Sequence, residues 1–132
     1  MALTPGSFRT PRAQVLGLGA AKHGAGHWVS ERLGAIALAP LVLWAVYSAL
    51  RLASIDYAST VRWIHNPLNA VLVVLLLAVG FAHMCSGLRV VIEDYFPNPL
   101  GRSALLAINV FVCALGGALA IFSILRVALV GI

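Results

Sequence analysis

Four side chains that could take part in chemistry lie in or beside long apolar runs of this sequence. They are Arg32, His83, Asp94 and Tyr95. An ionisable side chain at the centre of a membrane helix costs about 2.5–3.5 kcal/mol on insertion scales, so such residues usually face protein or a cofactor. His83 lies deepest, because the apolar run continues through residues 84–91 before any acidic residue follows.

The helical neighbours of His83 favour a flat ligand beside its imidazole. At about 100° per residue, Gly80 and Gly87 fall on the same helix face as His83, and neither has a side chain. A neutral imidazole in such a setting is suited to bind haem iron as an axial ligand. The alternative is a histidine that hydrogen-bonds to a neighbouring helix, with the glycines allowing close packing. His83 is the one histidine within the apolar runs, so a second histidine ligand would come from another subunit.

Asp94 and Tyr95 come at the end of the same run, with Asp94 about 16 Å along the helix axis from His83. A tyrosine hydroxyl can donate a hydrogen bond to a carbonyl oxygen, and a carboxylate can orient that hydroxyl or relay protons. The pair therefore suits a quinone head group. The alternative is an interfacial tyrosine next to a solvated acidic residue.

Arg32 stands where the first apolar run begins, shortly after His27 and Trp28. Its guanidinium is suited to pair with a buried anion such as a haem propionate. The alternative is that it extends to the lipid headgroups, which is the commoner role of arginine at such a position.

Three apolar stretches must position these residues, at about 33–53, 67–91 and 104–125. Crossing the hydrocarbon core takes roughly 20 helical residues. None of the stretches alternates apolar and polar residues as barrel strands do, and a membrane-spanning backbone must satisfy its own hydrogen bonds. The sequence therefore predicts an all-α membrane protein with three transmembrane helices. We expect residues 1–132 to form a single membrane-anchor domain. Polar connectors at 54–66 and 94–103 join its three spans.

The composition excludes an independent soluble enzyme. The 132 residues are 61% apolar and 10% charged, whereas soluble domains average about 25% charged residues. The net charge of +5 comes from single basic residues scattered between apolar runs, which indicates membrane-surface anchors and not nucleic-acid binding. Cys85 and Cys113 lie within apolar runs without CxxC spacing, so they predict neither a disulfide framework nor a zinc site.

The distribution of basic residues predicts the orientation, because Lys and Arg accumulate on the cytoplasmic side. One side of the predicted spans carries Arg9, Arg12, Lys22, Arg32, Arg89 and Arg102. The other carries Arg51, Arg62 and Arg126. We therefore expect a cytoplasmic N-terminal arm, residues 1–32, and a C-terminus on the opposite side.

The run from His83 to Tyr95, HMCSGLRVVIEDY, resembles the His, Gly and Asp-Tyr signature of a known family. This is the hydrophobic membrane anchor of succinate dehydrogenase, the small cytochrome b subunit of respiratory complex II. The segment 17–38 is similar to the alphaproteobacterial branch, and the three-span plan also matches. Two positions differ from the pattern expected: Glu31 replaces an uncharged residue and Gly34 replaces a hydroxyl residue.

The resemblance implies cofactors and site residues. His83 would ligate the iron of a b-type haem shared with a second membrane-anchor subunit, within a larger helical bundle. Tyr95 would donate to ubiquinone as substrate, with Asp94 beside it. Arg32, and less directly His27, would lie near the haem propionates or the quinone site.

The resemblance also implies partners and a place in the cell. The chain would attach the flavoprotein and iron–sulfur subunits of succinate dehydrogenase to the bacterial inner membrane, with its C-terminus periplasmic. It would not oxidise succinate itself, but would help to form the quinone site of this enzyme of electron transport and the tricarboxylic acid cycle.

Two other functions remain open at this point. One is a haem-free structural anchor of a fumarate reductase-like complex. The other is a small multidrug or ion carrier, which needs a charged residue in its transport path. Glu93 and Asp94 stand at the end of an apolar run and not at its middle, which argues against a carrier.

Overall fold

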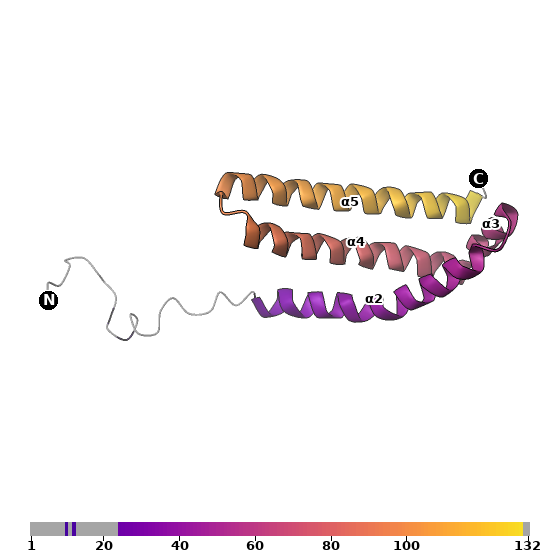
Figure 1. Cartoon of the computed structure of the whole chain (residues 1–132), viewed down its shortest axis with the longest axis horizontal. Helices are drawn as coiled ribbons and strands as arrows, with labels where there is room; N and C mark the ends of the chain where they lie inside the picture. The colour runs from indigo at the N-terminus through magenta and orange to yellow at the C-terminus, as the bar shows by residue number, and fades with distance from the viewer. Residues whose placement is uncertain (1–9, 11, 13–23, 131–132) are drawn as a thin grey trace.

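The structure, a computed structural model, describes residues 10, 12 and 24–130. Most of the arm 1–32 therefore lies outside the described residues. Residues 24–130 form four helices and no strand (Figure 1): α2 (Gly24–Leu52), α3 (Tyr57–His65), α4 (Pro67–Tyr95) and α5 (Pro99–Val130). Three of these, α2, α4 and α5, are long and apolar enough to cross a membrane. The predicted all-α, three-span fold is confirmed.

The helices extend beyond the predicted spans. Helix α2 begins at Gly24, whereas the predicted apolar stretch begins at about Leu33. Helix α4 continues to Tyr95, beyond the predicted end at about residue 91. The connector predicted at 94–103 is reduced to the three residues 96–98. The reason is that a helical backbone can continue into the headgroup region, where polar side chains reach water, whereas hydropathy delimits only the hydrocarbon part.

Helix α3 lies within the connector 54–66, for which the sequence predicted no helix. Asp56 caps its first turn: its carboxylate accepts hydrogen bonds from the Ser59 amide at 3.3 Å and from the Ser59 hydroxyl at 2.6 Å. Such a cap satisfies amides that the first helical turn leaves unpaired. At the other end of α3, His65 Nδ1 lies 2.9 Å from the Ala128 carbonyl oxygen of α5.

Asparagine side chains cap the first turns of α4 and α5. Asn66 Oδ1 accepts a hydrogen bond from the Leu68 amide at 3.0 Å, and Asn98 Oδ1 accepts one from the Leu100 amide at 3.1 Å. A proline follows each cap directly, at the first helical position, where its missing amide hydrogen costs nothing. The chain can therefore reverse direction within a few residues before α4 and before α5.

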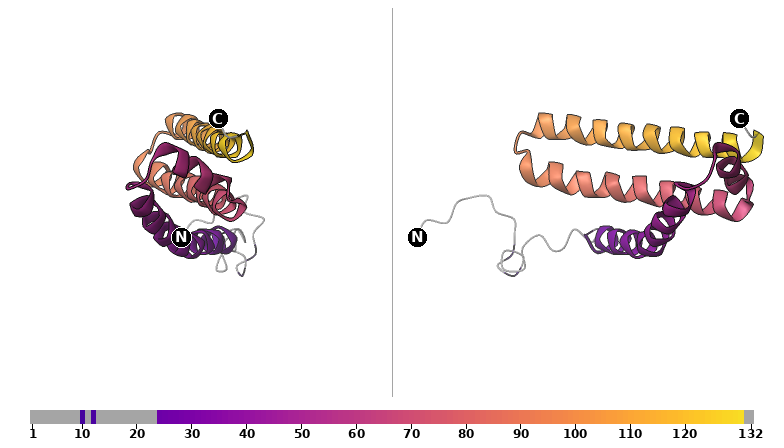
Figure 2. Two further views of the ribbon diagram at one scale, coloured as in Figure 1. Left: turned by 90° about the vertical axis from the view of Figure 1, so that its right-hand side faces the viewer. Right: turned by 45° about the vertical axis from the view of Figure 1, so that its right-hand side comes forward.

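Helix α4 packs between α2 and α5 (Figures 1 and 2). The beginning of α2 and the turn between α4 and α5 lie at one end of the bundle, which we call the arm end. Helix α3 and the end of α5 lie at the other, the α3 end. Phe81 of α4 packs against Gly116 and Gly117 of α5, where an added Cβ would lie 3.0 and 3.2 Å from its ring. Glycine therefore allows the close approach of these two helices.

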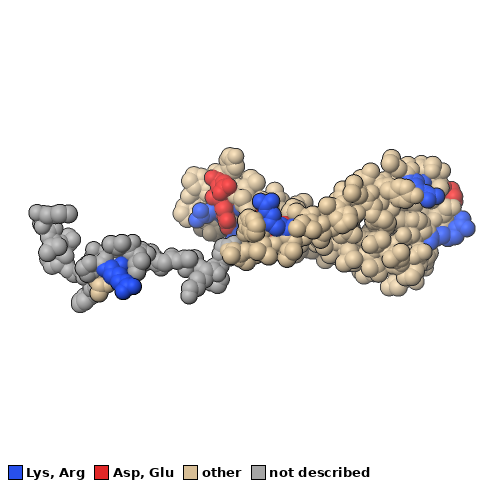
Figure 3. All heavy atoms as spheres, turned by 90° about the horizontal axis from the view of Figure 1, so that it is seen from below, with Lys and Arg blue, Asp and Glu red and all other residues tan. Residues whose placement is uncertain are grey.

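Most side chains of this single chain remain exposed. Among the described residues, the buried apolar side chains are those of Ala70 and Cys113, and the buried polar ones are those of Ser48 and Asn109. On the face shown in Figure 3, charged side chains gather toward the two ends of the helical bundle and leave its middle uncharged. This distribution is typical of a protein whose middle contacts lipid or other membrane subunits.

Candidate functional site

His83 lies in α4 with its ring turned toward α2. Its Nδ1 atom is buried and has no hydrogen-bond partner within the described residues. The backbone of Gly34 faces it, because a Cβ added at Gly34 would lie 3.4 Å from Nδ1. A buried polar atom without a partner is costly, so an unpaired ring nitrogen at this depth points to a special role for His83.

An open pocket of about 350 Å³ lies beside His83, between α2 and α4. Arg32 and Trp28 of α2 form one wall, and Gly87 of α4 lies beside His83 on the other. The Arg32 guanidinium stands over the Trp28 ring, with Cζ 5.3 Å from the ring centroid. The fold thus brings Arg32, His83 and Gly87 around one space.

A second open pocket of about 370 Å³ between α2 and α4 is also lined by His83. Small residues line most of it, including Ser30 and Gly34 of α2 and Ala82 of α4. Gly80 borders neither pocket, although no atom of another helix lies within 4 Å of its Cβ position. His83 therefore lines two spaces that its own chain leaves largely unfilled.

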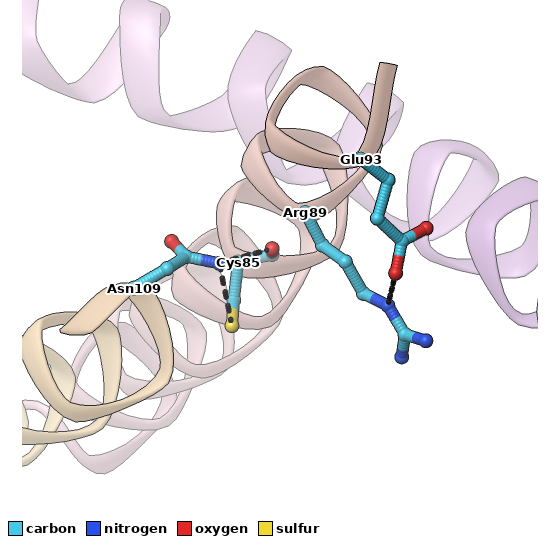
Figure 4. A network of polar contacts seen from close by, with 4 residues as sticks. All are labelled: Cys85, Arg89, Glu93 and Asn109. Carbon is cyan, nitrogen blue, oxygen red and sulfur yellow. Dashed lines mark hydrogen bonds and ion pairs between the residues drawn. The ribbon is translucent and has the colours of Figure 1, made fainter. Parts of the chain in front are cut away.

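Asp94 and Tyr95 end α4 at the arm end, away from both pockets. Both are exposed, and the Tyr95 side chain is among the most exposed, at 77%. The structure describes no hydrogen bond of either side chain within residues 24–130. Arg89 Nε instead pairs with Glu93 Oε1 at 2.8 Å (Figure 4). The predicted quinone residues therefore face outward from this chain, where a partner subunit would have to complete a site.

His27 lies in α2, but its side chain is outside the described part of the structure. Its predicted position near a propionate therefore stays a prediction.

Asn109 is a polar residue whose role was not predicted from the sequence. It is 7% exposed, and its Nδ2 donates a hydrogen bond to the Cys85 carbonyl oxygen of α4 at 2.9 Å (Figure 4). Its Oδ1 accepts a hydrogen bond from the Cys113 thiol at 3.5 Å. A single asparagine in an otherwise apolar run was the available signal, since such residues commonly hydrogen-bond between membrane helices. Both cysteines are free thiols.

Comparison with known proteins assigns this arrangement to a family. Residues 7–119 match the model of the succinate dehydrogenase/fumarate reductase transmembrane subunit. The succinate dehydrogenase hydrophobic membrane anchor subunit of Rickettsia bellii is 30% identical over 105 residues, which cover 79% of this chain and 84% of that protein. The same subunit of Paracoccus denitrificans is 28% identical over 122 residues, covering 92% and 94%. No solved structure matches the chain.

The chain therefore belongs to the family of succinate dehydrogenase/fumarate reductase transmembrane subunits. Within this family it is a membrane anchor subunit of succinate dehydrogenase. It is accordingly a multi-pass membrane protein that works in a complex with other subunits.

Proposed function

We propose that this subunit holds a b-type haem jointly with a second anchor subunit, with His83 as one axial ligand. The observation that carries the proposal is the His83 ring, which lines two open pockets while its Nδ1 is buried against Gly34. The other ring nitrogen, Nε2, is therefore the one that would bind the iron. When bound, such a haem supplies a one-electron carrier within the membrane.

Gly87 and Arg32 of this pocket fit the group, whereas the carboxylate of Glu31, which also lines it, would repel a propionate. Gly87 leaves space beside the imidazole, and the guanidinium of Arg32 can bind a propionate through paired hydrogen bonds. The cation–π contact with Trp28 holds Arg32 at the pocket wall. In the part of the chain that the structure describes, no three His, Cys, Asp or Glu side chains gather to hold a metal ion. A haem would need only one such donor from this chain, with another coming from the second anchor subunit.

We further propose that Tyr95 donates a hydrogen bond to a carbonyl oxygen of ubiquinone, with Asp94 orienting the phenol or relaying protons. Support comes from their position at the last turn of α4, where both side chains are exposed and free to meet a partner surface. The head group would then bind at the arm end of the bundle.

The same end is the proposed attachment site of the flavoprotein and iron–sulfur subunits, on the cytoplasmic side of the bacterial inner membrane. Arg32, Arg89 and Arg102 lie toward this end, and a cytoplasmic location agrees with the preference of basic residues for that side. In this orientation α3 and the end of α5 face the periplasm. A carrier function is not favoured, because Glu93 and Asp94 end α4 and lie outside the described pockets.

Replacement of His83 by alanine in the complete complex tests the haem proposal. We expect the low-spin b-type absorption spectrum and the haem content to be lost, while the subunits still co-purify. His65→Ala is the matched control, because His65 is an exposed histidine at the α3 end. Unchanged haem content in His83→Ala would overturn the assignment, and absence of haem from the unmodified complex would favour a haem-free anchor.

A further inference from the structure

A separate pocket of about 350 Å³ lies at the α3 end, bounded by the end of α2, by α3 and by the beginning of α4. Trp44 of α2 and Trp63 of α3 form one wall, with their rings stacked at a centroid distance of 5.7 Å and an interplanar angle of 20°. Asn69 of α4 donates a hydrogen bond to the Trp63 carbonyl oxygen at 2.9 Å. Contacts between three different elements therefore define its shape.

The charged residue of this pocket is Arg51, in the last turn of α2. Its Nη1 donates a hydrogen bond to the Tyr47 hydroxyl at 3.1 Å, and its Cζ lies 5.8 Å from the Tyr47 ring centroid. Neither contact neutralises the charge. Among residues 24–130, no carboxylate lies within ion-pair distance of Arg51.

The nearest acidic residue in the sequence, Asp56, is engaged elsewhere. Its carboxylate accepts two hydrogen bonds from Ser59, at 3.3 and 2.6 Å. The Ser59 hydroxyl in turn accepts a hydrogen bond from Arg62 at 3.0 Å. Asp56, Ser59 and Arg62 thus form their own network and leave the Arg51 charge without an anion.

Ser48 adds a second polar group to the same pocket. It is 7% exposed, one helical turn before Leu52, and its hydroxyl makes no hydrogen bond within the described residues. The Ser48 hydroxyl oxygen is not fully buried, so it can donate a hydrogen bond to a ligand in the pocket. The pocket therefore contains a guanidinium and a hydroxyl next to two stacked tryptophan rings.

The position of the pocket indicates the source of the anion. Arg51 ends the first span, so its guanidinium lies at the level of the lipid headgroups, where tryptophan and tyrosine also gather. Phosphate is the anion present at that depth, and a guanidinium binds its oxygens through paired hydrogen bonds. We propose that Arg51 and Ser48 bind the phosphate of an anionic phospholipid in the leaflet at the α3 end, with Trp44 and Trp63 lining the pocket.

The test compares the intact purified complex in phosphatidylcholine vesicles with and without phosphatidylglycerol. Bound phospholipid is counted by native mass spectrometry after mild detergent extraction, and thermal unfolding is followed in parallel. We expect the unmodified complex to retain phosphatidylglycerol and to unfold at a higher temperature in its presence. Arg51→Gln should weaken this retention about tenfold or more, the size expected for losing a charge-assisted hydrogen bond.

Arg126→Gln is the matched control, because Arg126 is an exposed arginine of α5 at the same end and does not line the pocket. It should retain phosphatidylglycerol like the unmodified complex. Ser48→Ala, which removes a single oxygen, should weaken retention severalfold and keeps the test decisive if Arg51→Gln fails to assemble.

Three results would overturn the proposal. The first is equal retention in the unmodified complex, in Arg51→Gln and in Ser48→Ala. The second is an equal loss in Arg51→Gln and Arg126→Gln, which would indicate a general effect of charge. The third is stabilisation by inorganic phosphate in pure phosphatidylcholine vesicles that equals the effect of phosphatidylglycerol and is lost in Arg51→Gln, which would identify the ligand as the free anion.

Discussion

The Nδ1 atom of His83 faces the backbone of Gly34, at 3.4 Å from the position that a Cβ would take. This nitrogen is buried and has no hydrogen-bond partner among the described residues. Position 34 is also where the family resemblance leads us to expect a hydroxyl residue. A glycine there brings α2 close to α4 but provides no side chain to pair with the imidazole.

Gly34→Ser should therefore stabilise the protein by supplying that partner. The contact distance leaves room for a Cβ, and a hydroxyl hydrogen bond contributes about 0.5–1.5 kcal/mol. Gly34→Ala is the comparison variant. Alanine has a higher helix propensity than serine by about 0.5 kcal/mol, so propensity alone would make the alanine variant the more stable one. We expect the serine variant to unfold at a higher temperature than the alanine variant in detergent. The opposite order would show that Nδ1 gains nothing from a hydroxyl at this position.

Tyr95→Phe should reduce electron transfer to ubiquinone by about tenfold or more, because a hydrogen bond to the carbonyl oxygen as it gains charge is lost. Succinate oxidation with an artificial acceptor should stay unchanged, since that reaction does not use the membrane site. Tyr57→Phe is a matched control, because Tyr57 is equally exposed, at 76%, at the opposite end. Equal activity of Tyr95→Phe and the unmodified complex in the quinone assay would remove Tyr95 from the site.

Asn109→Ala should weaken the packing of α5 on α4. The change removes the hydrogen bond to the Cys85 carbonyl oxygen, and polar contacts between membrane helices contribute about 0.6 kcal/mol on average and up to about 1.7 kcal/mol. Ser123→Ala is the control, because the Ser123 hydroxyl donates only to Leu119 within α5 itself. The free energy of unfolding in mixed micelles should fall for Asn109→Ala and stay within error for Ser123→Ala. Similar losses in both variants would argue against an interhelical role.

Asp56 should make the first turn of α3 sensitive to acid. Hydrogen bonds from the Ser59 side chain, followed by backbone hydrogen bonds and the charge of Arg62, hold the pKa of Asp56 below its ordinary value of 3.8 despite some desolvation. A lowered pKa in the folded state means that the carboxylate cap is fully present above about pH 3.8 and is lost as the pH falls below that value.

Hydrogen exchange of the α3 amides, corrected for intrinsic rates, measures this loss. We expect protection at neutral pH and faster exchange below about pH 3.8. Asp56→Asn should keep protection across the whole range, because asparagine caps helices about as well as aspartate and does not titrate. Asp56→Ala should exchange faster at every pH. A pH response of Asp56→Asn equal to that of the unmodified chain would place the titrating group elsewhere.

Local features of the sequence were sufficient to predict the number of spans. Hydropathy and helix length depend on consecutive residues, so the apolar runs predicted α2, α4 and α5 correctly. Helix α3 also has a local signal, because Asp56 caps its first turn. No helix was predicted there, since the connector 54–66 is short and polar. Helix ends were placed less well, since hydropathy does not detect helical turns in the headgroup region.

Which helix faces meet was decided by the tertiary structure alone. The family resemblance implied that His83 and Arg32 both lie near the haem, but the sequence did not indicate which faces of α2 and α4 meet, or that Asn109 would bind the backbone at Cys85. Such contacts depend on the rotation of each helix about its axis. That rotation is set by the packing of residues distant in sequence, such as Phe81 against the paired glycines of α5. Backbone hydrogen bonds within each helix are the same for every rotation, so the sequence determined the helices and packing between them determined the sites.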